Sequence, residues 1–229
     1  MSRHRTAEEA KRDSVECMGG PLGKLFHALW QEHAWLYAKW EEYLVLYGTK
    51  PSRIDLLNRV APCFFRIIQD VLWEDIVLHI ARLTDPRKSA GKANLTIRRL
   101  PDLVDDSNTA QALRGLISIA IQSSEFCRDW RNRHIAHRDL KLVLEKDIVP
   151  LEPANRKKIK DALDSIAEVL NAVSQQYTDS ETIFDIGEAP EGALSLLYVI
   201  DDGLKAGAER KERMRSGKYR KGDFSPRDL

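Results

Sequence analysis

The apolar residues of this chain recur every three or four positions over most of its length, which is the spacing of one face of an α-helix. The first long run predicts a helix over residues 22–47, with Gly48 as its stop signal and Pro51 opening the next element. A second run covers residues 52–83. Because Pro62 lies inside this run, we expect the second helix to be kinked or divided there.

The second half of the chain alternates polar connectors with further helical patterns. The expected elements are a polar loop at 84–94, a short helix at 96–103, a helix that begins near Asn108 or Thr109 and continues into residues 128–140, a helix at 154–177 and a last helix at 191–212. Strand patterns are hard to find, although residues 142–144 could be briefly extended. Long helices joined by short links are typical of a bundle. The expected fold class is therefore all-α, an antiparallel helical bundle with two long N-terminal helices.

The ends of the chain differ from its middle. Residues 1–20 form a polar lead-in, residues 21–212 are expected to form one helical domain, and residues 213–229 form a basic flexible tail. A chain of 229 residues is long enough to bury a core without disulfides or metals. The two ends lack an apolar periodic face, so we expect them to add little to stability.

Composition and charge exclude several classes of protein. The formal net charge is +1, so affinity for nucleic acid must come from a local patch. Three widely spaced cysteines, Cys17, Cys63 and Cys127, argue against a disulfide framework or a zinc knuckle. The chain starts without an apolar signal region, and no run reaches the ~18 apolar residues of a membrane span. We therefore expect a cytoplasmic protein with no membrane partner.

One short window stands apart from this ordinary helical pattern. The segment from Arg128 to Leu140 reads RDWRNRHIAHRDL, in which Asn132 follows Arg131 and His137 comes six positions after that arginine. In a continuous helix a six-residue step leaves two side chains ~120° apart. Arg131 and His137 therefore converge best where the helix distorts or ends, or where two copies of the chain meet.

This window resembles the HEPN superfamily, and in particular its HEPN-like family linked to abortive infection of phage-infected bacteria. The resemblance rests on RNRHIAH, on the two long helices upstream and on the Asp-Pro exit within residues 83–86, and it covers roughly residues 20–180. It implies a HEPN-like bundle, a ribonuclease activity and a homodimer. Arg131 and His137 are then the catalytic residues, with Asn132 and His134 in support.

The residue types suit cleavage of RNA by its own 2′-hydroxyl. Histidine can take or give a proton near neutral pH, and arginine presents a permanent planar cation to phosphate oxygens. Since the RNA supplies the nucleophile, neither a metal ion nor a cofactor is expected. The expected partners are an RNA substrate, a second copy of the chain and an antitoxin protein.

Other interpretations of the same residues remain open. Basic side chains at a helix C-terminus can simply complement the helix dipole. The chain could be a non-catalytic HEPN-like module that binds a nucleotide, RNA or a protein, or a purely structural dimeric bundle. His134 and His137 alone are too few ligands for a metal site. Arg128 and His134 also repeat the six-residue spacing.

Overall fold

The computed structural model describes residues 6–136, 144, 150–185 and 191–224. The chain divides into two compact units, one built from residues 1–41 and 70–186 and the other from residues 42–69 and 187–229. The helices α2 (Gly20–Tyr43) and α4 (Pro62–Leu83) each contribute to both units.

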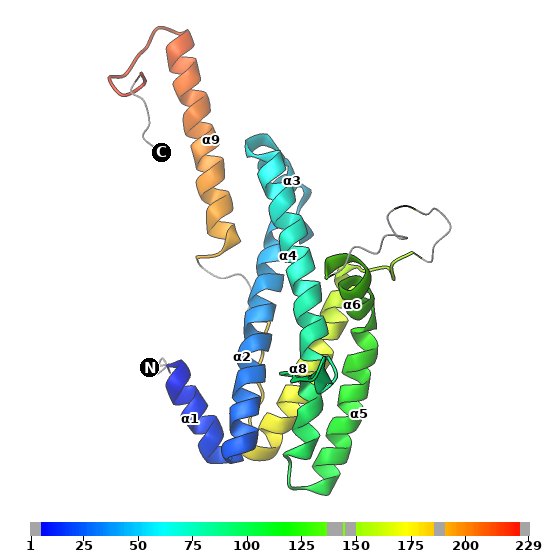
Figure 1. Ribbon diagram of the computed structural model, residues 1–229. Coiled ribbons are helices and arrows are strands. Elements are labelled where there is room, and N and C mark those ends of the chain that lie inside the picture. Colours follow the sequence, from blue (N-terminus) through cyan, green and yellow to red (C-terminus); the bar gives the residue numbers. More distant parts are fainter. Residues whose placement is uncertain (1–5, 137–143, 145–149, 186–190, 225–229) are drawn as a thin grey trace. The chain divides into compact units, whose positions relative to one another are not determined.

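The first unit is an antiparallel four-helix bundle. Its helices are α2, α4, α5 (Ser107–Ser123) and α8 (Arg156–Thr178), and successive helices run in opposite directions (Figure 1). Their apolar faces meet in a core in which the following side chains have no exposed surface: Leu29, Leu36, Ile76, Ile80, Leu113 and Ile166. The expected all-α bundle with two long N-terminal helices is thus confirmed.

Proline divides the second predicted helical run, as expected. The helix α3 (Pro51–Val60) ends before Ala61, and α4 begins at Pro62. A proline at the first helical position loses no hydrogen bond, because the first N–H groups of a helix have no partner within the helix. The preceding helix, α2, ends in a π-helical turn, η1 (Leu44–Gly48), close to the predicted stop.

Two polar side chains begin the helices of the second half. Asp106 caps α5 by accepting hydrogen bonds from the Thr109 amide at 2.6 Å and hydroxyl at 2.7 Å, and these bonds lower the pKa of Asp106. The helix thus begins at Ser107, one residue before the predicted start near Asn108 or Thr109. Asn155 caps α8 in the same way, through the Lys158 amide at 2.9 Å.

The predicted polar loop after α4 contains a small hairpin. The strands β1 (Lys88–Ser89) and β2 (Lys92–Ala93) pair antiparallel, with Lys88 opposite Ala93. The two turn residues, Ala90 and Gly91, both have positive φ, 48° and 78°, as a two-residue hairpin turn requires. A 3₁₀ helix, η2 (Ile97–Asp102), then returns the chain to α5.

The polar segment at the start of the chain contains a helix that the apolar pattern did not predict. Helix α1 (Ala7–Met18) begins with a capping box, in which Thr6 and Glu9 each bond the other's backbone amide. This helix packs closely on α2. A Cβ atom added at Gly23 would lie 2.3 Å from the Ser14 carbonyl oxygen.

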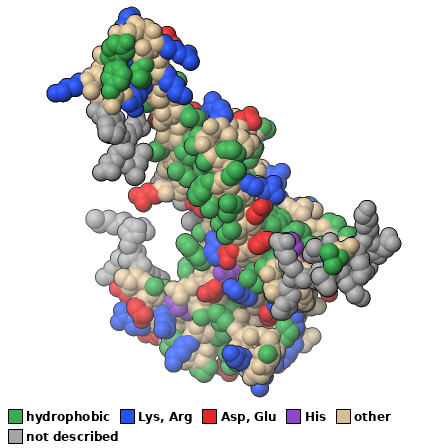
Figure 2. All heavy atoms as spheres, turned by 45° about the horizontal axis from the view of Figure 1, so that its top comes forward, with side chains coloured by type: hydrophobic (Ala, Val, Ile, Leu, Met, Phe, Trp, Pro, Cys, Tyr) green, Lys and Arg blue, Asp and Glu red, His purple; other side chains and the backbone are tan. Residues whose placement is uncertain are grey.

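The second unit holds η1, α3, the start of α4 and the helix α9 (Ala193–Arg215). The Glu42 carboxylate accepts a hydrogen bond from the Ala193 amide at 2.5 Å, which places a negative charge at the positive end of α9. After α9 the chain folds back, and Asp223 accepts hydrogen bonds from Arg210 and Arg213. Basic side chains gather at this end of α9 (Figure 2).

The close approach at Gly23 predicts a selective loss of stability. Gly23→Ala should lower the free energy of unfolding by about 1–3 kcal/mol, because the Ser14 backbone must move. Gly115→Ala on α5 is the matched control, since nothing lies within 4 Å of its added Cβ. The control should gain about 0.5–1 kcal/mol from its higher helix propensity. Urea unfolding measures both, and equal effects would contradict close packing at Gly23.

A buried histidine lies between α2 and its neighbours in the first unit. His33 has no exposed surface, and neither of its ring nitrogens has a hydrogen-bond partner among the described residues. Its ring packs edge-on against Tyr37 and Phe184, at centroid distances of 5.3 and 4.6 Å. Burial, and then the nearby His79, lower the pKa of His33 to about 3.

This lowered pKa predicts that acid weakens the bundle. Above pH 6.5 His33 is neutral in both the folded and the unfolded chain. Below pH 6.5 the unfolded chain binds a proton at His33, whereas the folded chain stays neutral there until about pH 3. Each pH unit in that window should cost up to about 1.4 kcal/mol. His33→Leu should therefore flatten the dependence of unfolding free energy on pH between about 3 and 6.5. An unchanged slope in urea titrations would show that His33 is not the acid-sensitive group.

Candidate functional site

The residues that follow α4 form a tightly bonded turn in the first unit. Thr84 is fully buried, and its carbonyl oxygen accepts hydrogen bonds from Arg98 Nε at 2.9 Å and from Arg128 Nη2 at 3.2 Å. Its hydroxyl donates to the Ile80 carbonyl at 3.0 Å and accepts from the Ser124 hydroxyl at 3.0 Å. The turn therefore joins the end of α4 to η2, through Arg98, and to residues 124–128, through Ser124 and Arg128.

The arginine-rich window follows a break and lies on a distorted helix. The helix α5 ends before Ser124, and the short α6 (Glu125–Trp130) continues into a π-helical turn, η3 (Arg131–Ile135). The Ala136 amide donates to the Arg131 carbonyl at 2.8 Å, five residues back. One uninterrupted helix was predicted here, so that prediction was wrong. Single π turns within α-helices occur frequently at functional sites.

Arg131 is held by a carboxylate from the turn after α4. Its Nη1 donates to both carboxylate oxygens of Asp85, at 2.5 and 2.6 Å. The side chains of Arg131 and Asp85 are 22% and 13% exposed, so this ion pair is largely shielded from water. The Nη2 group of Arg131 has no hydrogen-bond partner among the described residues.

Asn132 bonds its neighbour Arg131. The Arg131 Nε donates to the Asn132 side-chain oxygen at 3.0 Å, so Asn132 helps to fix the plane of the guanidinium group. Asn132 is itself exposed. Its side-chain NH₂ group has no partner among the residues that the structure describes, and it can donate to an anion.

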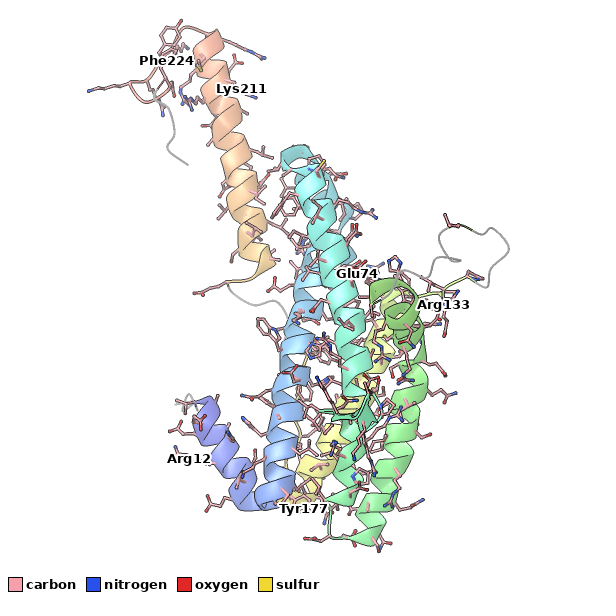
Figure 3. All side chains as sticks on the ribbon, viewed as in Figure 1. Arg12, Glu74, Arg133, Tyr177, Lys211 and Phe224 are labelled. Carbon is pink, nitrogen blue, oxygen red and sulfur yellow. The ribbon has the colours of Figure 1, made fainter. Side chains whose placement is uncertain are left out.

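His134 packs against aromatic rings and faces an acidic side chain. Its ring meets Trp130 edge-on at 5.5 Å, and Trp130 meets Trp73 of α4 at 6.4 Å. His134 Nε2 lies 3.4 Å from a carboxylate oxygen of Glu74, which is an ion pair only when the histidine is protonated. Figure 3 labels Glu74, which belongs to α4, and Arg133, which precedes His134 on η3.

The flanking residues attach this end of the bundle to the segment before α8. Asp129 accepts from Arg133 Nη1 at 3.2 Å and from the Glu152 amide at 3.0 Å. Trp130 Nε1 donates to the Glu152 carbonyl at 2.9 Å. Arg133 thus makes structural contacts, with Asp129 and with the Pro150 carbonyl at 3.4 Å.

His137 lies outside the described residues, so its distance from Arg131 stays a prediction. The structure brings Arg131, Asn132 and His134 together on one π turn. Within the described part of the chain, no group of three or more His, Cys, Asp or Glu side chains is arranged to hold a metal ion. No described helix is long and apolar enough to cross a membrane.

Asp85 is the site residue that the sequence reasoning did not identify. Its signal was present, because an Asp-Pro pair directly after a long helix was part of the family resemblance. The residue before a proline is disfavoured in helical conformation. The Asp of this pair therefore lies just after the helix, where its carboxylate can bond other side chains. The pattern could not show that this carboxylate reaches an arginine 46 positions later in the chain.

The comparisons with known proteins agree with the resemblance. The family model HEPN_AbiU2, described as AbiU2, matches residues 20–193. The search of curated proteins gave no match, and neither did the search of solved structures. Because the match covers most of the chain and includes the four bundle helices and the RNRHIAH window, this protein belongs to the AbiU2 family of HEPN-like abortive-infection proteins.

Proposed function

We propose that this protein is a metal-independent endoribonuclease of HEPN type that acts in phage defence or as a toxin. Its membership of a HEPN abortive-infection family supports the setting. The observation that carries the chemistry is the position of Arg131 on a π turn, where Asp85 and Asn132 fix its guanidinium group. A fixed arginine is prepared to bind a phosphate without a large loss of side-chain entropy.

Arg131 is the proposed phosphate ligand. Two of its three nitrogens are occupied by Asp85 and Asn132, and Nη2 remains to donate to a phosphate oxygen. The Asn132 NH₂ group lies on the same turn and supplies a second donor, which is neutral. Positive charge beside a phosphorane stabilises the transition state of cleavage, because negative charge develops on its equatorial oxygens.

His137 is the proposed proton-transfer residue. The 2′-hydroxyl of the RNA must lose a proton as it attacks phosphorus, and the departing 5′-oxygen must gain one. Histidine serves either role near neutral pH. The products of this reaction are a 2′,3′-cyclic phosphate and a 5′-hydroxyl, since the attacking oxygen belongs to the same nucleotide.

A second copy of the chain completes the proposed site. One Arg131/His137 set supplies one imidazole for two proton transfers, and a homodimer supplies two. The second unit exposes apolar side chains at the α3–α4 junction, where hydrophobic surface is visible in Figure 2. Val60, Phe64 and Ile67 are 42%, 56% and 61% exposed there. Such a surface is better explained by a partner than by solvent.

The ion pair of Arg131 with Asp85 also favours a second candidate, a non-catalytic HEPN-like module that binds a nucleotide, RNA or a protein. A charge neutralised by its own carboxylate can have a purely structural role. In both candidates an antitoxin protein is the proposed partner. Cleavage of RNA by site variants distinguishes the two candidates.

The chemical proposal predicts the behaviour of two variants. His137→Ala should slow cleavage of RNA by about 10²–10⁴, the usual contribution of a general acid or base. Arg131→Lys should also lose activity, because an ammonium group cannot donate to Asp85, Asn132 and phosphate with the same planar geometry. Cleavage is followed by gel with EDTA present, and end-group analysis identifies the cyclic phosphate.

The matched control for His137→Ala is His134→Ala, which removes the other imidazole of the window. It should reduce the rate far less, since His134 packs on Trp130 and faces Glu74. Circular dichroism should show all three variants folded. RNA with a 2′-deoxy group at the cleaved position should resist the enzyme. Cleavage by His137→Ala at the wild-type rate, or only with added metal, would favour the binding-module candidate.

The proposed dimer predicts a surface-specific effect. Phe64→Asp should shift the protein from dimer to monomer in light scattering, because it places a charge in the exposed apolar surface. Phe224→Asp is the control, since Phe224 is 62% exposed in the tail. The control should leave the mass unchanged. A wild-type protein that is a fully active monomer at high concentration would exclude the dimeric site.

A further inference from the structure

A cavity of about 450 Å³ lies in the first unit, between α5 and the segment that carries the hairpin and η2. Its walls are both apolar and basic. The lining side chains used here are Pro86, Arg98, Pro101, Arg114, Ile117 and Ile121. Apolar faces combined with cations suit a ligand that has a flat hydrophobic part and a negative charge.

Two of the arginines at this cavity keep their charge available. Arg87 also lines the cavity but is neutralised by Asp102, with Nη1 2.5 Å from the carboxylate. Arg98 uses only Nε, which donates to the Thr84 carbonyl, and Arg114 is exposed. Neither Arg98 nor Arg114 forms an ion pair with a carboxylate among the described residues. The cavity therefore carries positive charge, which the nearby Asp85 carboxylate offsets only in part.

The cavity adjoins the Arg131 site through the turn after α4. Pro86 forms part of its wall, and the preceding residue, Asp85, holds Arg131. Arg98 and Arg128 both donate to the Thr84 carbonyl, so they approach each other closely. Burial, and then the charge of Arg128, lower the pKa of Arg98. Consecutive residues, Asp85 and Pro86, therefore contact Arg131 and line the cavity.

We propose that the cavity binds the nucleotide of single-stranded RNA next to the cleaved phosphodiester. Arg98 and Arg114 hold its phosphate, and Pro101, Ile117 and Ile121 contact its base. The strand must be single because a duplex buries the base faces against each other. This inference rests on the proposed ribonuclease function, which it extends by placing the substrate on the protein surface.

Binding of an uncleavable strand tests the inference without requiring catalysis. The probe is a short fluorescent RNA with 2′-O-methyl groups throughout, and anisotropy gives its Kd. Arg114→Gln should weaken binding about tenfold, since it removes a charge-assisted contact to phosphate. It should also lower the slope of log Kd against log salt by about 0.7, the value for one phosphate contact on a single strand.

The matched control is Arg12→Gln, which removes the same charge from an exposed position on α1, away from α5 (Figure 3). Its Kd and salt slope should equal those of the wild type. Ser118→Trp is a second, charge-neutral variant, because Ser118 is exposed at the cavity and a large ring should fill it. It should weaken binding by a similar factor without changing the salt slope.

The outcomes separate this inference from the proposed function. If the wild type fails to bind the probe, or if Arg114→Gln and Ser118→Trp bind it as the wild type does, the RNA site is excluded, whether or not the protein cleaves RNA. A free nucleoside monophosphate that competes as strongly as the strand would show a nucleotide site and overturn the RNA proposal. If both variants weaken binding while the wild type cleaves nothing, the RNA site at the cavity is supported and the ribonuclease proposal fails.

Discussion

The hydrogen-bonded turn at Thr84 and Asp85 is the constraint on which the functional end of the bundle depends. Buried backbone carbonyls must find donors, and the Thr84 carbonyl obtains two from Arg98 and Arg128. The Asp85 carbonyl accepts from the Thr96 hydroxyl at 2.8 Å, while its carboxylate fixes Arg131. One short turn therefore sets the position of η2, of α6 and of the π turn. Loss of both Arg98 and Arg128 would leave the buried Thr84 carbonyl unsatisfied, at a cost of about 1–3 kcal/mol.

The same turn determines the electrostatics of the site. Asp85 is one carboxylate near two arginines, Arg98 and Arg131, and Arg128 adds a third cation beside Arg98, so the cluster retains net positive charge. Arg128 also keeps a buried Nε that has no partner among the described residues. Such a cluster is stable only where the guanidinium groups have other acceptors, and the Thr84 carbonyl provides one. The arginine cluster therefore connects neighbouring elements and also forms a local positive patch, in a chain whose net charge is only +1.

The sequence predicted the long helices well and the site only in part. Apolar periodicity identifies a helix when one face is buried over many turns, which explains the agreement for α2, α4 and α8. Helix α1 was missed because its sequence has no long apolar stripe; its signals are the capping box of Thr6 and Glu9 and the close packing at Gly23. The break at Ser124 was missed because apolar periodicity carries no signal for it, and one contact of the Ser124 hydroxyl is with Thr84, 40 positions away. Arg131 could be selected from its local motif, but its partner Asp85 depends on tertiary packing.

In the proposed ribonuclease, the ion pair between Arg131 and Asp85 would limit how the RNA substrate binds. Removing one partner of a buried pair typically costs about 3–5 kcal/mol, so a phosphate gains little by displacing Asp85 and should bind instead beside it, at Nη2. One such contact gives weak affinity, because association itself costs several kcal/mol. The remaining affinity must come from contacts further along the strand. The cations at the neighbouring cavity, Arg98 and Arg114, are the described groups placed to supply them. A strand bound at several points would be held in register before the reacting phosphodiester meets Arg131, and a free phosphate would not.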